Sequence, residues 1–340
     1  MMATALDPAA AFRRLAEQHR PLAVSGIATV ALLVLFAFGL VLDPRTIAGT
    51  PAWLKPAKFA VSIAVYTFTL LWLLGHVRQH TPLRARLVRA VGWVVLITFA
   101  LEWLAILTQV VRGTTSHFNV ATPFDAALWA LMAAAINVLL VTNVLVAGLL
   151  LTQRFERTSL GWALRLGLAI TIVGMAQAFL MTSPTALQLA GWRSGETVRI
   201  VGAHSVGAPD GSAGMPVTGW RSDVGDLRVG HFVGLHALQV IPLFGVWLQR
   251  RRRLDEGQRT ALVGVAAAGY LGVTVLVTWQ ALRAQPLLRP DALTLGALAL
   301  LVGACAVGAV LALRWRPARA PLAATDDVSA RVSAANAGDA

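Results

Sequence analysis

Four histidines are the residues of this sequence with the widest range of chemistry. His117 lies in the segment RGTTSHFN, His204 lies in AHSVGAPDG, and His231 and His236 lie in GDLRVGHFVGLHALQ. Neutral imidazole is a common ligand of copper, iron and zinc, so these side chains are candidates for binding a metal ion or haem b. His231 and His236 are five residues apart and would point about 140° apart on a helix. Unless His231 precedes the helix, we expect only one of the two to join His117 or His204.

Glu102 is the strongest single candidate for a functional residue, because it interrupts a long apolar run. A carboxylate within a membrane span is costly, so it usually faces the interior of a helix bundle or a cavity and has a partner. Lys58, near the start of another apolar run, is the partner that we expect. Glu102 could carry a proton or orient a ligand; the alternatives are a structural ion pair and a protonated buried acid.

Three further polar residues, together with Glu102 and Lys58, make up a candidate pocket. Gln109 is expected at the same depth in the membrane as Glu102, or closer to the outer surface. Asp125 follows Thr122-Pro123 in the form of a capping box, which favours a role at a helix start over catalysis. Gln239 comes three residues after His236 and shares its helix face. It could orient the His236 ring, but a hydrogen bond between helices is the favoured interpretation.

The composition places these residues in a membrane. The chain has 340 residues, of which 57% are hydrophobic and 13% are charged, and its mean hydropathy is +0.67. A soluble domain usually carries about 25% charged residues. The net charge of +13 is interpreted as membrane topology, not as nucleic-acid binding. The single cysteine, Cys305, excludes a disulfide within the chain and a cysteine-based zinc or iron–sulfur site.

Apolar runs predict an all-α bundle of about eight transmembrane helices. The expected spans are 22–42, 56–76, 88–111, 124–151, 161–181, 231–249, 260–280 and 291–313. With both termini in the cytoplasm, nineteen of the 29 Lys and Arg residues lie on the inner side, as the positive-inside rule favours. We therefore expect a cytoplasmic segment 1–21, a membrane domain 22–313 with an outer loop 183–230, and a disordered cytoplasmic tail 314–340.

Smaller signals indicate helix starts and helix contacts. Thr50-Pro51 and Thr122-Pro123 each predict a capped helix start. The glycine pairs Gly167 and Gly174, and Gly296 and Gly303, predict faces where helices pack closely. No Walker loop, GxGxxG or HExxH motif is present, which leaves nucleotide-driven transport and zincin-type proteolysis without support.

Three segments resemble a family of uncharacterised bacterial multi-pass membrane proteins. They are GTPAWLKPAKFAVSIAVYTFTLLWLL, RGTTSHFN and GDLRVGHFVGLHALQVIPLFG, and the resemblance covers most of residues 50–250. It implies a location in the bacterial inner membrane. It implies no activity and assigns no catalytic residue.

The sequence leaves the function open between three interpretations, with enzymatic activity undecided. The first is a redox or metal-binding protein whose outer histidines hold haem b or copper. The second is a transporter or channel for a small solute or ion, and the third is a sensor or assembly factor that binds a partner through the outer loop. A membrane enzyme acting on lipid ranks last, because the closely spaced histidine pairs of such enzymes are missing. In each case we expect an outward-facing polar pocket lined by the second, third, fourth and sixth spans and covered by 183–230.

Overall fold

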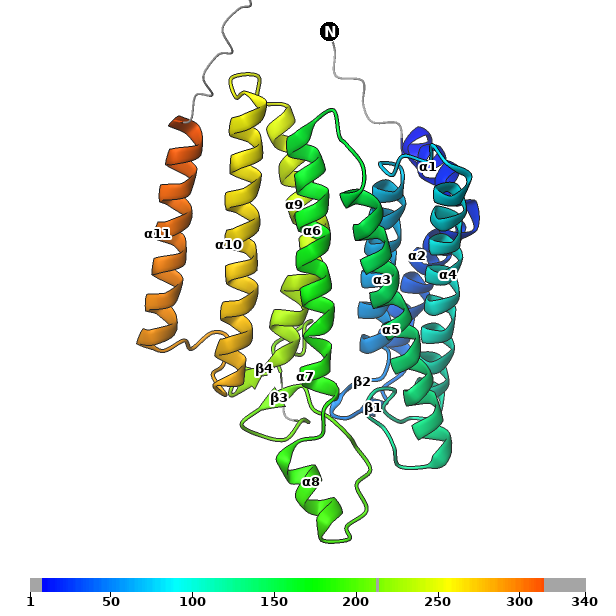
Figure 1. Cartoon of the computed structure of the whole chain (residues 1–340). Coiled ribbons are helices and arrows are strands. Elements are labelled where there is room, and N and C mark those ends of the chain that lie inside the picture. The colour runs from blue at the N-terminus through cyan, green and yellow to red at the C-terminus, as the bar shows by residue number, and fades with distance from the viewer. Residues whose placement is uncertain (1–7, 212–213, 315–340) are drawn as a thin grey trace, which may run out of the picture.

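Long apolar helices build this protein (Figure 1). The computed structural model describes residues 8–211 and 214–314. Eight of the described helices are long and apolar enough to cross a membrane: α2 (Arg20–Leu42), α3 (Leu54–Leu74), α4 (Pro82–Val111), α5 (Pro123–Leu151), α6 (Thr158–Ala176), α9 (Leu227–Gln249), α10 (Glu256–Leu282) and α11 (Ala292–Arg314). The predicted fold, an all-α bundle of eight spans, is confirmed, and the chain is a multi-pass membrane protein.

A helix precedes the bundle, and the segment that follows the bundle lies almost wholly outside the described residues. A short helix, α1 (Pro8–Gln18), packs beside α2 and α3, so the predicted segment 1–21 contains a helix and the start of the first span. The predicted tail 314–340 lies outside the described residues except for Arg314. We call the end of the bundle that bears the long connection before α9 the outer end, following the charge count, and the opposite end the inner end.

Two predicted helix starts have different outcomes. The Thr122 side chain accepts a hydrogen bond from the amide of Asp125 at 3.1 Å, so the predicted N-cap of α5 is confirmed. The predicted start at Thr50-Pro51 is wrong. Those residues form strand β2 (Thr50–Pro51), which pairs antiparallel with β1 (Thr46–Ile47) in a hairpin. The chain reverses in this hairpin before α3 begins at Leu54.

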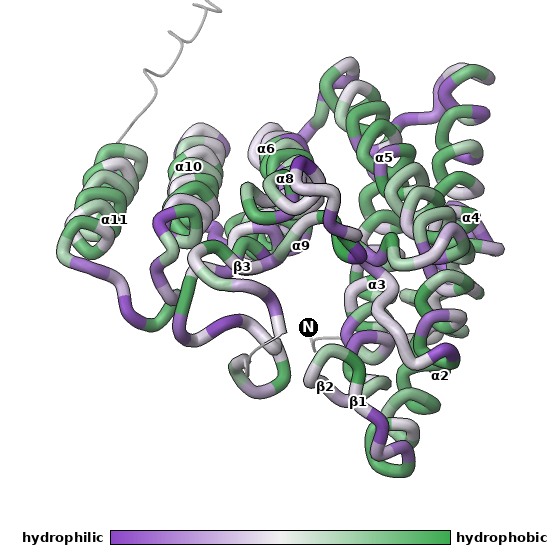
Figure 2. Tube along the Cα trace, turned by 90° about the horizontal axis from the view of Figure 1, so that it is seen from below, coloured by the Kyte–Doolittle hydropathy of each residue, from purple (hydrophilic) through white to green (hydrophobic). Residues whose placement is uncertain are grey.

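The helices gather into two groups (Figures 1 and 2). The first group contains α1 to α5, and the second contains α6, α9, α10 and α11. Helix α5 lies beside α6 and makes the main helix contact between the groups, while α11 packs mainly against α10 among the described helices. The two groups are therefore connected more loosely than the helices within each of them.

Glycines allow α6 and α9 to approach closely in the second group. A Cβ atom added to Gly174 would lie 2.6 Å from the backbone carbon of Gly234, and Gly167 comes similarly close to α9. The first predicted glycine pair is therefore confirmed as a packing face. The second prediction is wrong, because a Cβ atom on Gly296 or Gly303 would meet nothing within 4 Å in the described part of the chain.

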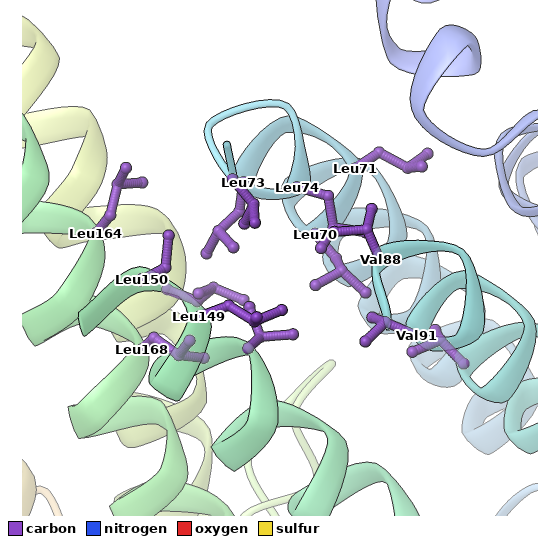
Figure 3. Packing of buried hydrophobic residues seen from close by; sticks show 14 of the residues in the cluster. Leu70, Leu71, Leu73, Leu74, Val88, Val91, Leu149, Leu150, Leu164 and Leu168 are labelled. Carbon is purple, nitrogen blue, oxygen red and sulfur yellow. The ribbon is translucent and has the colours of Figure 1, made fainter. Parts of the chain in front are cut away.

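Leucine and valine side chains fill the inner half of the bundle, where the two groups meet. Figure 3 shows this packing, to which α3, α4, α5 and α6 contribute Leu70, Leu71, Leu73, Leu74, Val88, Val91, Leu149, Leu150, Leu164 and Leu168. Each of these side chains is at most 7% exposed. The inner half is thus closed by apolar packing, and the polar candidates lie toward the outer end.

The described residues of the long connection at the outer end form a cap. It includes the short helices α7 (Ala178–Thr182) and α8 (Ala186–Arg193), and strands β3 (Ser205–Val206) and β4 (Gly225–Asp226), which pair antiparallel. A bridge between Asn119 and Ile200 joins the cap to the loop that follows α4. Because α9 already begins at Leu227, the cap ends before residue 230, and His231 lies within the helix.

Candidate functional site

Glu102 and Lys55 form the centre of the candidate site. Glu102 is 1% exposed, and neither oxygen of its carboxyl group has a hydrogen-bond partner among the described residues. It lies nine residues before the end of α4 at Val111, or about 14 Å along the helix axis. Lys55 lies in the first turn of α3, and its charge interacts with Glu102. Its ammonium group makes no hydrogen bond or close ion pair within residues 8–211 and 214–314.

The expected ion pair between Glu102 and Lys58 is not formed in the described part of the chain. The Lys58 ammonium instead donates a hydrogen bond to the carbonyl of Thr218 at 3.0 Å. The guanidinium of Arg228, in α9, donates to the neighbouring carbonyl of Gly219 at 2.7 Å. Lys58 is thus drawn toward the cap, and the turn 215–219 is fastened by one cation from each helix group.

Lys55, Lys58 and Arg228 form a cluster of positive charge at the outer end. The charges of Lys55, Lys58 and Arg228 act on one another, although Arg228 also pairs with the Asp226 carboxylate at 2.5 Å. Like charges held close together at low dielectric constant repel, and a bound anion relieves that repulsion. The cluster is therefore suited to an anionic ligand.

His117 lies among aromatic rings beside this cluster. The centre of its ring is 5.5 Å from the ring centres of both Phe59 and Trp129, and its Nδ1 is 3.1 Å from the Ser116 hydroxyl. Burial lowers the pKa of His117 well below its ordinary value, and the nearby charge of Lys55 lowers it further. The imidazole is therefore neutral near pH 7.

Phe118 connects His117 to the cap. Its φ angle of 63° is unusual for a bulky residue, and its carbonyl accepts a hydrogen bond from the amide of Val201 at 2.8 Å. The ring of His204 lies 4.8 Å from the ring of Phe118, and Nδ1 of His204 lies 2.9 Å from the Asp210 carboxylate. Burial lowers the pKa of His204 even though Asp210 opposes that shift.

His231, His236 and Gln239 make different contacts in α9. Nδ1 of His231 donates to the carbonyl of Gly174 at 2.7 Å, which joins α9 to α6. His236 is exposed, and its Nδ1 lies 3.3 Å from the side-chain oxygen of Gln239. Gln239 also donates to the Thr69 hydroxyl of α3 at 3.2 Å, so it both contacts the His236 ring and connects two helices.

Asp125 and Gln109 are hydrogen-bonded to each other at the start of α5, although the side-chain oxygen of Gln109 is buried without a partner among the described residues. Gln109 donates to one oxygen of Asp125 at 2.7 Å, and the Thr122 hydroxyl donates to the other at 2.6 Å. Arg112 completes the set with an ion pair of 3.2 Å. These contacts tie the Asp125 carboxylate to Thr122, the N-cap of α5, and leave at most one of its lone pairs without a partner among the described residues.

A metal centre finds no support in this geometry. Among the described residues, no three His, Cys, Asp or Glu side chains gather in a way that could hold a metal ion. His117 and His204 approach the same phenylalanine, whereas His231 and His236 are engaged elsewhere. Haem b or copper bound by these four histidines therefore stays a prediction without structural support.

Three residues of the site were not among the site residues predicted from the sequence. Lys55 and Lys58 are three residues apart at the start of one span and share a helix face, a signal that could have identified Lys55. Arg228 carries no such signal, because its position beside Lys58 depends on how the two groups meet. Phe118 is unremarkable in sequence, and only its left-handed backbone sets it apart.

Comparison of the chain with family models, curated proteins and solved structures gives no match. The resemblance to uncharacterised bacterial membrane proteins, and the inner-membrane location that it implies, therefore stay predictions.

Proposed function

We propose that the protein binds a small anionic solute at its outer end and moves it across a bacterial inner membrane together with a proton carried by Glu102. One observation carries the proposal: Glu102 is buried with both oxygens unpaired, and the cation that interacts with it, Lys55, has no hydrogen-bond acceptor among the described residues. A buried carboxylate without a partner is costly, and the half-buried ammonium of Lys55 has donors available. A proton on Glu102 would remove the cost of its charge, and an anion on Lys55 would give the ammonium a partner.

The arrangement of the two helix groups fits a protein that opens to one side at a time. Leucine and valine side chains from both groups close the inner half, whereas the polar cluster lies toward the outer end. Lys58 and Arg228 hold adjacent carbonyls of the turn 215–219 from opposite groups. Any separation of the groups at the outer end must therefore break one of these two hydrogen bonds.

The chemistry of the cluster indicates an anion, not a cation. Lys55, Lys58 and Arg228 outnumber the two carboxyl groups that interact with them, Asp226 and Glu102. His117 is neutral and can add a hydrogen-bond donor without adding charge. The alternative of a metal-binding redox protein lacks a comparable set of ligands in the described chain.

A thermal-shift experiment tests the anion site directly. Chloride, sulfate, inorganic phosphate, lactate and succinate are titrated separately onto the detergent-purified protein, and the unfolding temperature is measured. We expect at least one anion to raise it, because a ligand that binds only the folded state stabilises that state. The rise should be absent in Lys55→Met and retained in Arg193→Gln, which removes an exposed cation of α8. No rise with any of these anions, or an equal rise in both variants, would refute the proposed site.

Binding of a partner protein is a second candidate, favoured by the surface of α8. Leu187 is 76% exposed and Trp192 is 45% exposed on this helix, which projects from the outer end (Figure 1). If α8 binds a partner, a photo-crosslinker at position 187 should give a discrete crosslinked product in native membranes, and Trp192→Ser should remove it. The same variant should leave the anion-dependent shift unchanged.

A further inference from the structure

Four consecutive arginines form an unpaired basic turn at the inner end. Arg250 to Arg253 connect α9 to α10, and all four are exposed. Within the described residues, none of their guanidinium groups forms an ion pair; the Arg251 guanidinium lies over the Trp247 ring at 4.2 Å. Indole rings prefer the level of the lipid headgroups, which places this turn at the membrane surface.

The acidic residues next to the turn are already engaged. The Asp255 carboxylate caps α10 by accepting a hydrogen bond from the amide of Gln258 at 2.8 Å. Glu256 accepts from the amide of Ser159 at 2.8 Å and pairs with Arg259 at 3.2 Å. The positive charge of the four arginines is therefore left without a local counter-charge.

An apolar groove of about 360 Å³ lies between α10 and α11 near the same end. Its lining consists of small or aliphatic side chains: Ala261, Val265, Gly308, Leu311 and Ala312. Ala261 comes five residues after the start of α10, so the groove begins about 7.5 Å along the helix from Glu256, which follows the arginine turn by three residues. In Figure 1 the turn and the last turn of α11 lie at the same end of the bundle.

The top of the groove is fixed by a contact between the two helices. The Gln258 side chain donates a hydrogen bond to the carbonyl of Leu313 at 2.8 Å. Arg314, in the last turn of α11, is exposed beside it. Basic residues thus lie at the same end of α10 and α11 as an open apolar groove.

We infer that this end of α10 and α11 binds an anionic phospholipid, with its phosphate at Arg252 and Arg253 and one acyl chain in the groove. The charge of these arginines selects the phosphate, because an arginine near a membrane surface attracts anionic lipid. The groove supplies apolar contact at the depth where the acyl chain begins. The site is separate from the outer cluster and does not depend on the proposed transport.

Native mass spectrometry of the full chain tests the lipid site. Phosphatidylglycerol and phosphatidylcholine are titrated separately onto the detergent-purified protein, and the lipid-bound fraction is measured. We expect the wild type to retain phosphatidylglycerol in preference to phosphatidylcholine. Arg252→Gln with Arg253→Gln should weaken phosphatidylglycerol binding at least about tenfold, given the contribution of each arginine near a surface.

Two further variants make the test specific. Arg86→Gln with Arg89→Gln removes two other exposed arginines from the inner end and should leave the preference unchanged. Ala261→Leu fills the groove without altering charge and should also weaken binding of phosphatidylglycerol. Equal weakening by both arginine pairs would show a diffuse charge effect and overturn the inference. Unchanged binding in Ala261→Leu would overturn the placement of the acyl chain.

Discussion

Replacement of Glu102 by leucine should stabilise the protein while abolishing the proposed transport. Both carboxyl oxygens of Glu102 are buried without a partner in the described chain, and an unsatisfied buried polar group costs about 1–3 kcal/mol. Leucine has a similar size and no polar atom, so Glu102→Leu should recover that cost. Each kcal/mol shifts the unfolding temperature of a domain of 150–250 residues by about 2–4 °C, which gives a rise of roughly 2–12 °C.

The assay is thermal unfolding of detergent-purified protein, followed by tryptophan fluorescence and checked for monodispersity by gel filtration. Glu196→Leu is the matched control, because Glu196 is exposed in the cap and its replacement should shift the unfolding temperature by less than about 2 °C. A clear fall in Glu102→Leu, without a fall in the control, would refute the reasoning. It would mean that Glu102 is ionised and stabilises the charge of Lys55.

Three further predictions concern the packing, the pH dependence and the cap. Gly174→Ala should lower the unfolding temperature by several degrees, because overpacking costs about 1–3 kcal/mol. The control Gly296→Ala should not lower it. Equal effects of the two changes would contradict the packing described between α6 and α9. Because the pKa of His117 is lowered in the folded state, the unfolded state binds more protons below about pH 6.5, and stability should fall by up to about 1.4 kcal/mol per pH unit as the pH drops. Thermal unfolding at pH 7.5 and 5.5 measures this, and a drop that is as large in His117→Gln as in the wild type would contradict it. Lys58→Met should speed amide hydrogen exchange in 215–219 relative to the rest of the cap, and unchanged exchange there would show that the hydrogen bond to Thr218 does not hold the turn.

The sequence predicts the spans well because lipid imposes one dominant requirement. A helix must be apolar over about 20 residues to cross the membrane, so the helices are visible as runs of hydrophobic residues. The N-cap at Thr122 was equally readable, since its hydroxyl serves its own helix. By contrast, the same dipeptide pattern at Thr50 failed, because the preceding residues pair with it in a hairpin. A short sequence pattern therefore predicts a helix start reliably only where its hydrogen-bond partner belongs to the same helix.

The candidate site was harder to predict, because its geometry depends on contacts between distant segments. Glu102 was recognisable from its cost in an apolar run, but its neighbour is Lys55 and not Lys58. That outcome depends on Thr218, a residue 160 positions away from Lys58, which accepts the Lys58 hydrogen bond. The separation of His231 and His236 followed from helical spacing alone, whereas the meeting of His117 and His204 at Phe118 required the fold of the cap.

Glycine pairs show the same distinction on a smaller scale. Gly174 and Gly296 each belong to a pair spaced by seven residues in an apolar helix. Gly174 meets the backbone of Gly234, whereas Gly296 faces open space within the described chain, because α11 packs mainly against α10 and turns this face away from it. Spacing identifies a face on which a helix can pack closely, but the neighbouring helix decides whether that face is used.

The most direct test of the central claim, that Lys55 binds an anion while Glu102 carries a proton, is a flux measurement in proteoliposomes that contain a pH-sensitive dye. An inward gradient of the anion that stabilises the protein is imposed, and the internal pH is followed in the wild type, Lys55→Met, Glu102→Gln and the control Glu196→Gln. Coupled entry of anion and proton predicts internal acidification in the wild type and in Glu196→Gln, and none in the other two variants. Acidification that is equally fast in Glu102→Gln, or anion entry without any change of internal pH, would contradict the claim.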